Sequence, residues 1–180
     1  MKEPSLDRSQ VSELGHLSVT ITISTVCTPS FPSNNTSRWL RQGGVNPTGA
    51  DPKVRVLLVD DHGGVRKAVR ALLETYPRFE VIGEAVDGRE GINEATKLKP
   101  DVVVLNVSMP VLGGIEAARV IKSESPRSAI VILSSSADKH LVEAAKEIGA
   151  RAYVRKTRIG AALVKAIEDA IAGGDFVLVE

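Results

Sequence analysis

Residues 100–110 read PDVVVLNVSMP, and this stretch decides the fold. Val102, Val103, Val104 and Leu105 form an unbroken apolar run between turn-forming residues, which is typical of a strand buried on both faces. The run ends on one polar side chain, Asn106, before a turn at Met109 and Pro110. Strands of this kind occur in parallel sheets that helices cover on both sides. The stretch therefore predicts an α/β protein.

The same alternation extends from residue 53 to about residue 172, where each short apolar run is followed by apolar residues at helical spacing. The predicted strands are residues 54–59, 79–86, 102–105, 129–133 and 152–154. Repeated strand–helix units predict a doubly wound, five-stranded parallel sheet, because right-handed crossovers place helices on both faces. Ligands of such sheets bind at the carboxyl ends of the strands.

The N-terminal region has a different composition. Residues 1–52 are rich in Ser, Thr, Asn, Pro and Gly, and they offer too little apolar surface to offset the entropy of ordering the chain. We expect a disordered tail and linker at 1–52, a folded domain at 53–174 and a C-terminal tail at 175–180. Alternation of apolar and polar residues at 17–23 leaves an added edge strand as an alternative.

Composition excludes several classes of protein. Lys and Arg number 23 against 22 Asp and Glu, and these charges form no basic block of the kind that binds nucleic acid or a membrane surface. The single cysteine, Cys27, excludes an intramolecular disulfide framework and a thiolate zinc cluster. No apolar run approaches the ~20 residues of a membrane span, and no signal peptide is evident. We therefore expect a cytoplasmic protein.

Polar side chains follow the predicted strands at their carboxyl ends. Asp60 and Asp61 end the first strand, Asn106 the third and Ser134 the fourth, and Lys156 follows the fifth. Adjacent carboxylates suit Mg²⁺, and a hydroxyl with an ammonium group suits phosphoryl oxygens. A carboxylate at position 106 could attack phosphorus, whereas the carboxamide of asparagine is a very poor nucleophile. These residues predict a phosphoryl site without its nucleophile.

Residues 53 to about 172 resemble the receiver domain of two-component response regulators, the CheY-like (βα)5 fold. Five motifs in order carry the resemblance: VLLVDDH at 56–62, PDVVVL at 100–105, Met109-Pro110 with Gly114, VILS at 131–134, and AYVRK at 152–156. The resemblance implies the flavodoxin-like strand order 2-1-3-4-5. It also implies a role in phosphorelay signal transduction.

The resemblance assigns a metal site and a phosphoacceptor position. Asp60, Asp61 and the backbone carbonyl of Ser108 would hold Mg²⁺. Asn106 occupies the phosphoacceptor position, so we expect a pseudo-receiver that takes no phosphate there. One carboxylate fewer also predicts weaker Mg²⁺ binding.

The resemblance also assigns the groups that would respond to phosphate. Ser134 and Lys156 would bind the phosphoryl oxygens, and Tyr153 would be the aromatic switch that turns inward or outward. We expect docking of a sensor kinase or another signalling protein through the last two helices and the fifth strand, with a homodimer left open. The chain stops six residues after Gly174, so we expect a stand-alone receiver without a DNA-binding output domain and without enzymatic activity.

Two other functions remain open from the residues. A phosphatase-type enzyme would use Asp60 as its nucleophile, although His62 stands where such enzymes carry a second aspartate. A vestigial interaction domain would keep the fold and use none of the site. The Asp60–Asp61 pair could also be a plain turn and helix cap, and Ser134 could cap the helix that begins near Asp138.

Overall fold

The structure of the protein is a computed structural model that describes residues 52–180. The predicted disordered tail and the alternative strand at 17–23 lie outside the described residues. The elements in chain order are β1 (Val54–Val59), α2 (Gly63–Glu74), β2 (Phe79–Ala85), α3 (Gly88–Leu98), β3 (Val102–Asn106), α4 (Gly114–Glu124), β4 (Ala129–Ser134), α5 (Lys139–Glu147), β5 (Ala152–Arg155), the 3-10 turn η1 (Lys156–Arg158), α6 (Ala161–Ala172) and β6 (Val177–Val179).

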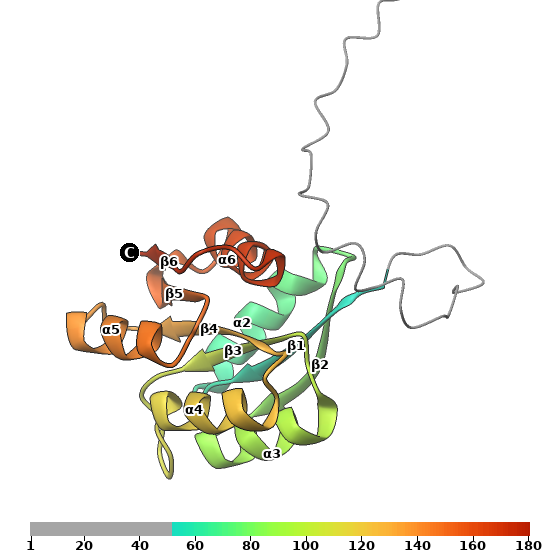
Figure 1. Ribbon diagram of the computed structural model, residues 1–180. Helices are drawn as coiled ribbons and strands as arrows, with labels where there is room; N and C mark the ends of the chain where they lie inside the picture. The colour runs from blue at the N-terminus through green and yellow to red at the C-terminus, as the bar shows by residue number, and fades with distance from the viewer. Residues whose placement is uncertain (1–51) are drawn as a thin grey trace, which may run out of the picture. The chain divides into compact units, whose positions relative to one another are not determined.

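The sheet is parallel and has the strand order β2-β1-β3-β4-β5-β6 (Figure 1). The predicted doubly wound fold and the order of the first five strands are confirmed, and each predicted strand agrees with the structure to within one residue. The predicted count of five strands is wrong. Val177–Val179 pairs with β5 as a sixth strand, so part of the predicted C-terminal tail at 175–180 belongs to the sheet.

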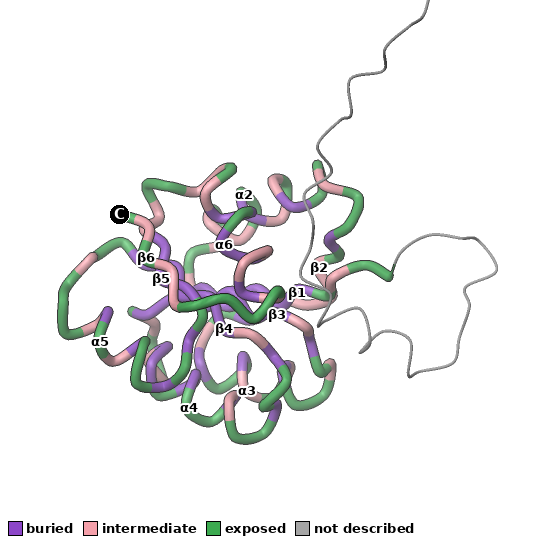
Figure 2. Tube along the Cα trace, turned by 45° about the horizontal axis from the view of Figure 1, so that its top comes forward, coloured by how far each residue is buried: buried purple, intermediate pink, exposed green. Residues whose placement is uncertain are grey.

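Helices cover both faces of the sheet, as Figure 1 shows. Helices α3, α4 and α5 pack on one face, where Leu57, Leu105 and Ile132 are fully or nearly fully buried. Helices α2 and α6 pack on the other face, against Val56, Val104 and Val154 among others. The central strands form the buried centre in Figure 2. Burial on both faces is why these strands read as unbroken apolar runs. None of the helices in residues 52–180 is long and apolar enough to cross a membrane.

Strand register brings the polar strand ends to one edge of the sheet. Val59 pairs with Leu105, which sets Asp60 level with Asn106. Asn106 pairs with Leu133, and the next residue of β4, Ser134, pairs with Arg155 of β5. Parallel strands in this register carry their carboxyl ends to the same side.

A close backbone contact shapes the loop that follows β3. The amide of Gly114 donates to the carbonyl of Val107 at 2.8 Å, which folds the start of α4 back onto the end of β3. A Cβ atom at residue 114 would overlap the carbonyl oxygen of Asn106, so only glycine fits there. The helix start is thereby held beside the strand end that carries Asn106.

Candidate functional site

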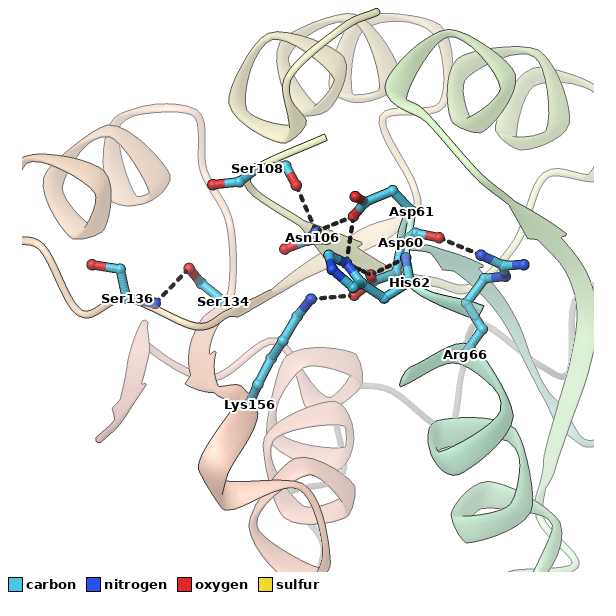
Figure 3. A network of polar contacts seen from close by, with 9 residues as sticks. All are labelled: Asp60, Asp61, His62, Arg66, Asn106, Ser108, Ser134, Ser136 and Lys156. Carbon is cyan, nitrogen blue, oxygen red and sulfur yellow. Dashed lines mark hydrogen bonds and ion pairs between the residues drawn. The ribbon is translucent and has the colours of Figure 1, made fainter. Parts of the chain in front are cut away.

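An acidic corner lies at the end of β1. The described carboxylate and imidazole atoms of Asp60, Asp61 and His62 lie within 4.8 Å of one another (Figure 3). Asp60 is buried, and its Oδ1 accepts a hydrogen bond from the backbone amide of His62 at 2.9 Å. The exposed His62 ring lies over the corner, with Nδ1 2.9 Å from Oδ1 of Asp61. The local backbone and the imidazole therefore fix the positions of the two carboxylates in this corner.

Lys156 closes the corner from the side of β5. Its Nζ lies 2.7 Å from Oδ2 of Asp60, and both side chains are largely buried. The contact is an ion pair without the alignment of a good hydrogen bond, and Oδ2 has no hydrogen-bond partner among the described residues. The lysine that the sequence assigns to phosphoryl oxygens thus pairs with a carboxylate in this structure.

Asn106 joins the two sides of the predicted metal site. Its buried Nδ2 donates to Oδ1 of Asp61 at 2.9 Å and to the backbone carbonyl of Ser108 at 2.8 Å. Both partners can only accept hydrogen bonds, so the atom of the Asn106 amide that faces them must be the nitrogen. The amide spans two of the three groups that the family resemblance assigns to Mg²⁺, and this feature was not evident from the sequence.

Asp61 remains a carboxylate in this setting. Burial acts to raise its pKa, but hydrogen bonds and charge from His62, together with the hydrogen bond from Asn106, outweigh burial and lower the pKa. Two donors thus hold the negative charge of Asp61.

The chemistry of the donors fits a hard divalent cation. Asp60, Asp61 and the Ser108 carbonyl all present oxygen, the ligand atom that Mg²⁺ takes. Mg²⁺ in such a position would neutralise anionic oxygens. Two of these oxygens, on Asp61 and Ser108, already accept the amide protons of Asn106.

The predicted phosphoryl-binding serine and the predicted switch meet through Ser136. The buried Oγ of Ser134 accepts from the amide of Ser136 at 3.2 Å, and Figure 3 shows its hydroxyl turned toward that residue. The hydroxyl of Tyr153 donates to the Ser136 carbonyl at 2.7 Å, and its side chain is fully buried. Tyr153 therefore lies in the inward position. The alternative role of Ser134 as a helix cap is wrong, because Asp138 caps α5.

Three charged residues beside the corner were missed by the sequence reasoning. Arg66 of α2 donates through Nη1 to the carbonyl of Asp60 at 2.6 Å and through Nε to Glu84 of β2 at 2.9 Å. Arg70 donates to the same carboxylate at 2.7 Å. The hydrogen bond from Arg70, and then that from Arg66, lower the pKa of Glu84 against its partial burial. The available signal in the sequence was Glu84, a charged residue within the predicted strand at 79–86.

Comparison with known proteins decides the family. The family model for the response regulator receiver domain matches residues 56–168. The chain belongs to this family. Among solved structures, the receiver resembles a LuxR-family two-component response regulator from Aurantimonas sp. SI85-9A1, with a TM-score of 0.66, 37% identity, and coverage of 69% of this chain and 89% of that one.

Curated relatives are longer proteins. The receiver is 42% identical over 120 residues to the transcriptional regulatory protein LiaR of Bacillus subtilis, covering 67% of this chain and 57% of that protein. It is 42% identical over 108 residues to a protein-glutamate methylesterase/protein-glutamine glutaminase of Geobacter sulfurreducens, covering 60% of this chain and 29% of the relative. The chain thus spans little more than half of LiaR and under a third of the methylesterase. These matches do not favour the phosphatase alternative.

Proposed function

We propose that this protein is a pseudo-receiver that signals in two-component phosphorelay systems by docking other proteins, without taking phosphate at Asn106. The observation that carries the proposal is the carboxamide at the phosphoacceptor position, tied by hydrogen bonds to Asp61 and to the Ser108 carbonyl. A carboxamide cannot attack phosphorus as a carboxylate does. The input is therefore something other than an aspartyl phosphate at this position.

The closed state of the corner supports the proposal. Lys156 pairs with Asp60, and Asn106 donates to Asp61 beside His62, so both carboxylates of the corner already have partners within the protein. Phosphoryl oxygens at this site would compete with Asp60 for the ammonium group of Lys156.

Mg²⁺ binds weakly in this proposal. A cation between Asp61 and Ser108 has to displace both hydrogen bonds of Asn106, after which the amide has to rotate to offer its oxygen. The site also carries one negative charge fewer than it would with a carboxylate at residue 106. Both effects lower the affinity for the cation.

Partners are proteins in this proposal. The partner is a sensor kinase or another cytoplasmic signalling protein that contacts α5, β5 and α6, and the receiver domain itself has no enzymatic activity. The relatives named as transcriptional regulators and methylesterase extend beyond the region that they share with this chain.

Phosphorylation can be tested directly. The full chain is incubated with acetyl phosphate and Mg²⁺, and intact mass is recorded. We expect no stoichiometric gain of one phosphoryl group in the wild type. A stoichiometric adduct would refute the phosphate-independent function.

The matched control is Asn106→Asp, which restores a carboxylate at the same position. Gain of one phosphoryl group by this variant would show that the reagent and the rest of the site are competent. Failure of the variant to gain phosphate would show that more than the nucleophile has been lost.

A further inference from the structure

The C-terminal strand β6 occupies the edge of β5, between α5 and α6. This is part of the surface that the proposed function assigns to partners. Val177 pairs with Ala152, Leu178 with Tyr153, and Val179 with Val154. No strand other than β6 pairs with that edge of β5 in the described part of the chain. The segment thus fills a position where a strand from a partner would add to the sheet.

Contacts from both faces hold the segment that carries β6. Phe176 packs against the core cluster under α5, and the ammonium group of Lys146 lies 5.5 Å from the centre of its ring. Val177 and Val179 pack on the opposite face, in the cluster that α6 covers. Phe176 therefore packs on one core, and Val177 and Val179 pack on the other, which is the alternation of a strand.

Two arginines hold the ends of the segment by its backbone. Arg151 donates to the carbonyl of Gly174 at 3.3 Å, and Arg158 donates through Nε to the carbonyl of Glu180 at 2.7 Å. Gly173 caps α6 in the left-handed conformation, with φ of 79°. That conformation, which favours glycine, turns the chain from α6 back along β5.

Strand β6 also lies beside Tyr153. Paired residues of neighbouring strands place their side chains on the same face, so Leu178 shares the face of Tyr153. Phe176, two residues earlier on that face, belongs to the cluster that contains the tyrosine ring. Because β6 is the outer neighbour of β5, a ring that moves outward past the sheet edge meets this segment.

We propose that residues 175–180 form a strap that closes the β5 edge and holds Tyr153 inside, so that docking on α5, β5 and α6 requires β6 to leave. The statement about docking rests on the proposed function, whereas closure of the edge does not. The strap is suited to leave. It has three paired residues at one end of the sheet, and its valines are only partly buried while Leu178 is 44% exposed. Such elements open at far lower free energy than a buried strand.

The test compares the full-length wild type with a Val177→Asp/Val179→Asp variant, which places charges in the core contacts of β6. Val120→Asp is the matched control, since Val120 is an exposed valine of α4. Hydrogen exchange reports release of residues 177–179, and nitration followed by peptide mass spectrometry reports access to Tyr153. The second of the two tyrosines, the partly buried Tyr76, is the reference within the chain.

We expect fast exchange at residues 177–179 and a rise of about tenfold or more in Tyr153 nitration in the double variant, because loss of both valine contacts shifts the opening equilibrium at least that far. Nitration of Tyr76 stays unchanged, and Val120→Asp matches the wild type. Unchanged Tyr153 nitration despite fast exchange of β6 would overturn the strap, as would unchanged exchange of β6.

If the double variant unfolds, so that nitration rises at both tyrosines, a second variant, Arg158→Ala, tests the strap instead. This exposed side chain contacts the Glu180 carbonyl and leaves the core intact when removed. A smaller rise in both β6 exchange and Tyr153 nitration supports the strap, and no rise in Tyr153 nitration overturns it. No phosphate enters these measurements, so their failure is distinct from failure of the proposed function.

Discussion

Replacing Asn106 with aspartate changes one atom of the side chain and reverses its role. The nitrogen that donates to Asp61 at 2.9 Å and to the Ser108 carbonyl at 2.8 Å becomes an oxygen that faces two acceptors. The variant therefore loses two hydrogen bonds and gains a repulsion between carboxylates. We predict that Asn106→Asp destabilises the fold when Mg²⁺ is absent.

The size of the loss follows from the geometry. Two carboxylates about 4 Å apart repel by about 4 kcal/mol at an effective dielectric constant of 20. Protonating the new aspartate at pH 7 instead also costs about 4 kcal/mol, because that pH is about three units above its ordinary pKa. Water at the partly exposed Asp61 and the ammonium group of Lys156 weaken this repulsion. Each lost hydrogen bond adds about 1 kcal/mol. The net expectation is a loss of about 3 kcal/mol.

Urea unfolding at pH 7, with EDTA or with Mg²⁺, measures the effect. In EDTA the variant should lose about 3 kcal/mol, which lowers the melting temperature by about 10 °C in a domain of this size. Mg²⁺ at about 100 times its dissociation constant should return about 2.7 kcal/mol to the variant. The wild type should gain less than about 1 kcal/mol at the same concentration, because its affinity is weaker.

The control is Asn93→Asp, the same change at an exposed position of α3, which should alter stability little. The reasoning is refuted if Asn106→Asp is as stable as the wild type in EDTA. Equal stabilisation of both proteins by Mg²⁺ would also refute it.

Three further changes test other parts of the structure by urea unfolding. Glu84→Gln should cost about 1 kcal/mol of stability at pH 7 and nothing near pH 3. The pKa of Glu84 is lowered in the folded protein, so its stabilisation is present above the ordinary pKa of 4.5 and is lost as the pH falls through the folded pKa. A stability difference that persists in acid would contradict this. Val111→Gly should stabilise the fold by about 0.5 kcal/mol, because Val111 has a φ of 66°, a left-handed conformation that favours glycine, and its 74% exposed side chain packs little. Val111→Ala keeps a side chain in the same left-handed conformation and should bring no such gain. Gly114→Ala should destabilise by about 3 kcal/mol through overlap with the Asn106 carbonyl, and a neutral result would show that the loop can move away.

The central fold was predictable because each buried strand carries its own signal. The runs at 56–59, 102–105 and 129–133 have four or more consecutive apolar residues, which is typical of strands buried on both faces. Strand β6 was not predictable in this way. The strand–helix alternation that located the other short strand, at 152–154, does not extend to 177–179, and only contacts with β5 make these residues part of the sheet.

The site was predictable in its residues and less so in its contacts. Asp60, Asp61 and Asn106 meet because they end parallel strands in register, which follows from the fold alone. The ion pair of Lys156 with Asp60 and the double donation by Asn106 depend on side-chain rotations that spacing does not encode. Sequence identifies which groups share an edge, and packing decides which of them pair.

The two hydrogen bonds of the Asn106 amide also bear on how this protein evolves. Codons for asparagine and aspartate differ by a single base, so the carboxylate is always one mutation away. A lineage that takes that step gives up about 3 kcal/mol before any benefit from phosphate, a large share of the about 5–15 kcal/mol that keeps a domain folded. The change from asparagine to aspartate at residue 106 is thus genetically short and energetically steep.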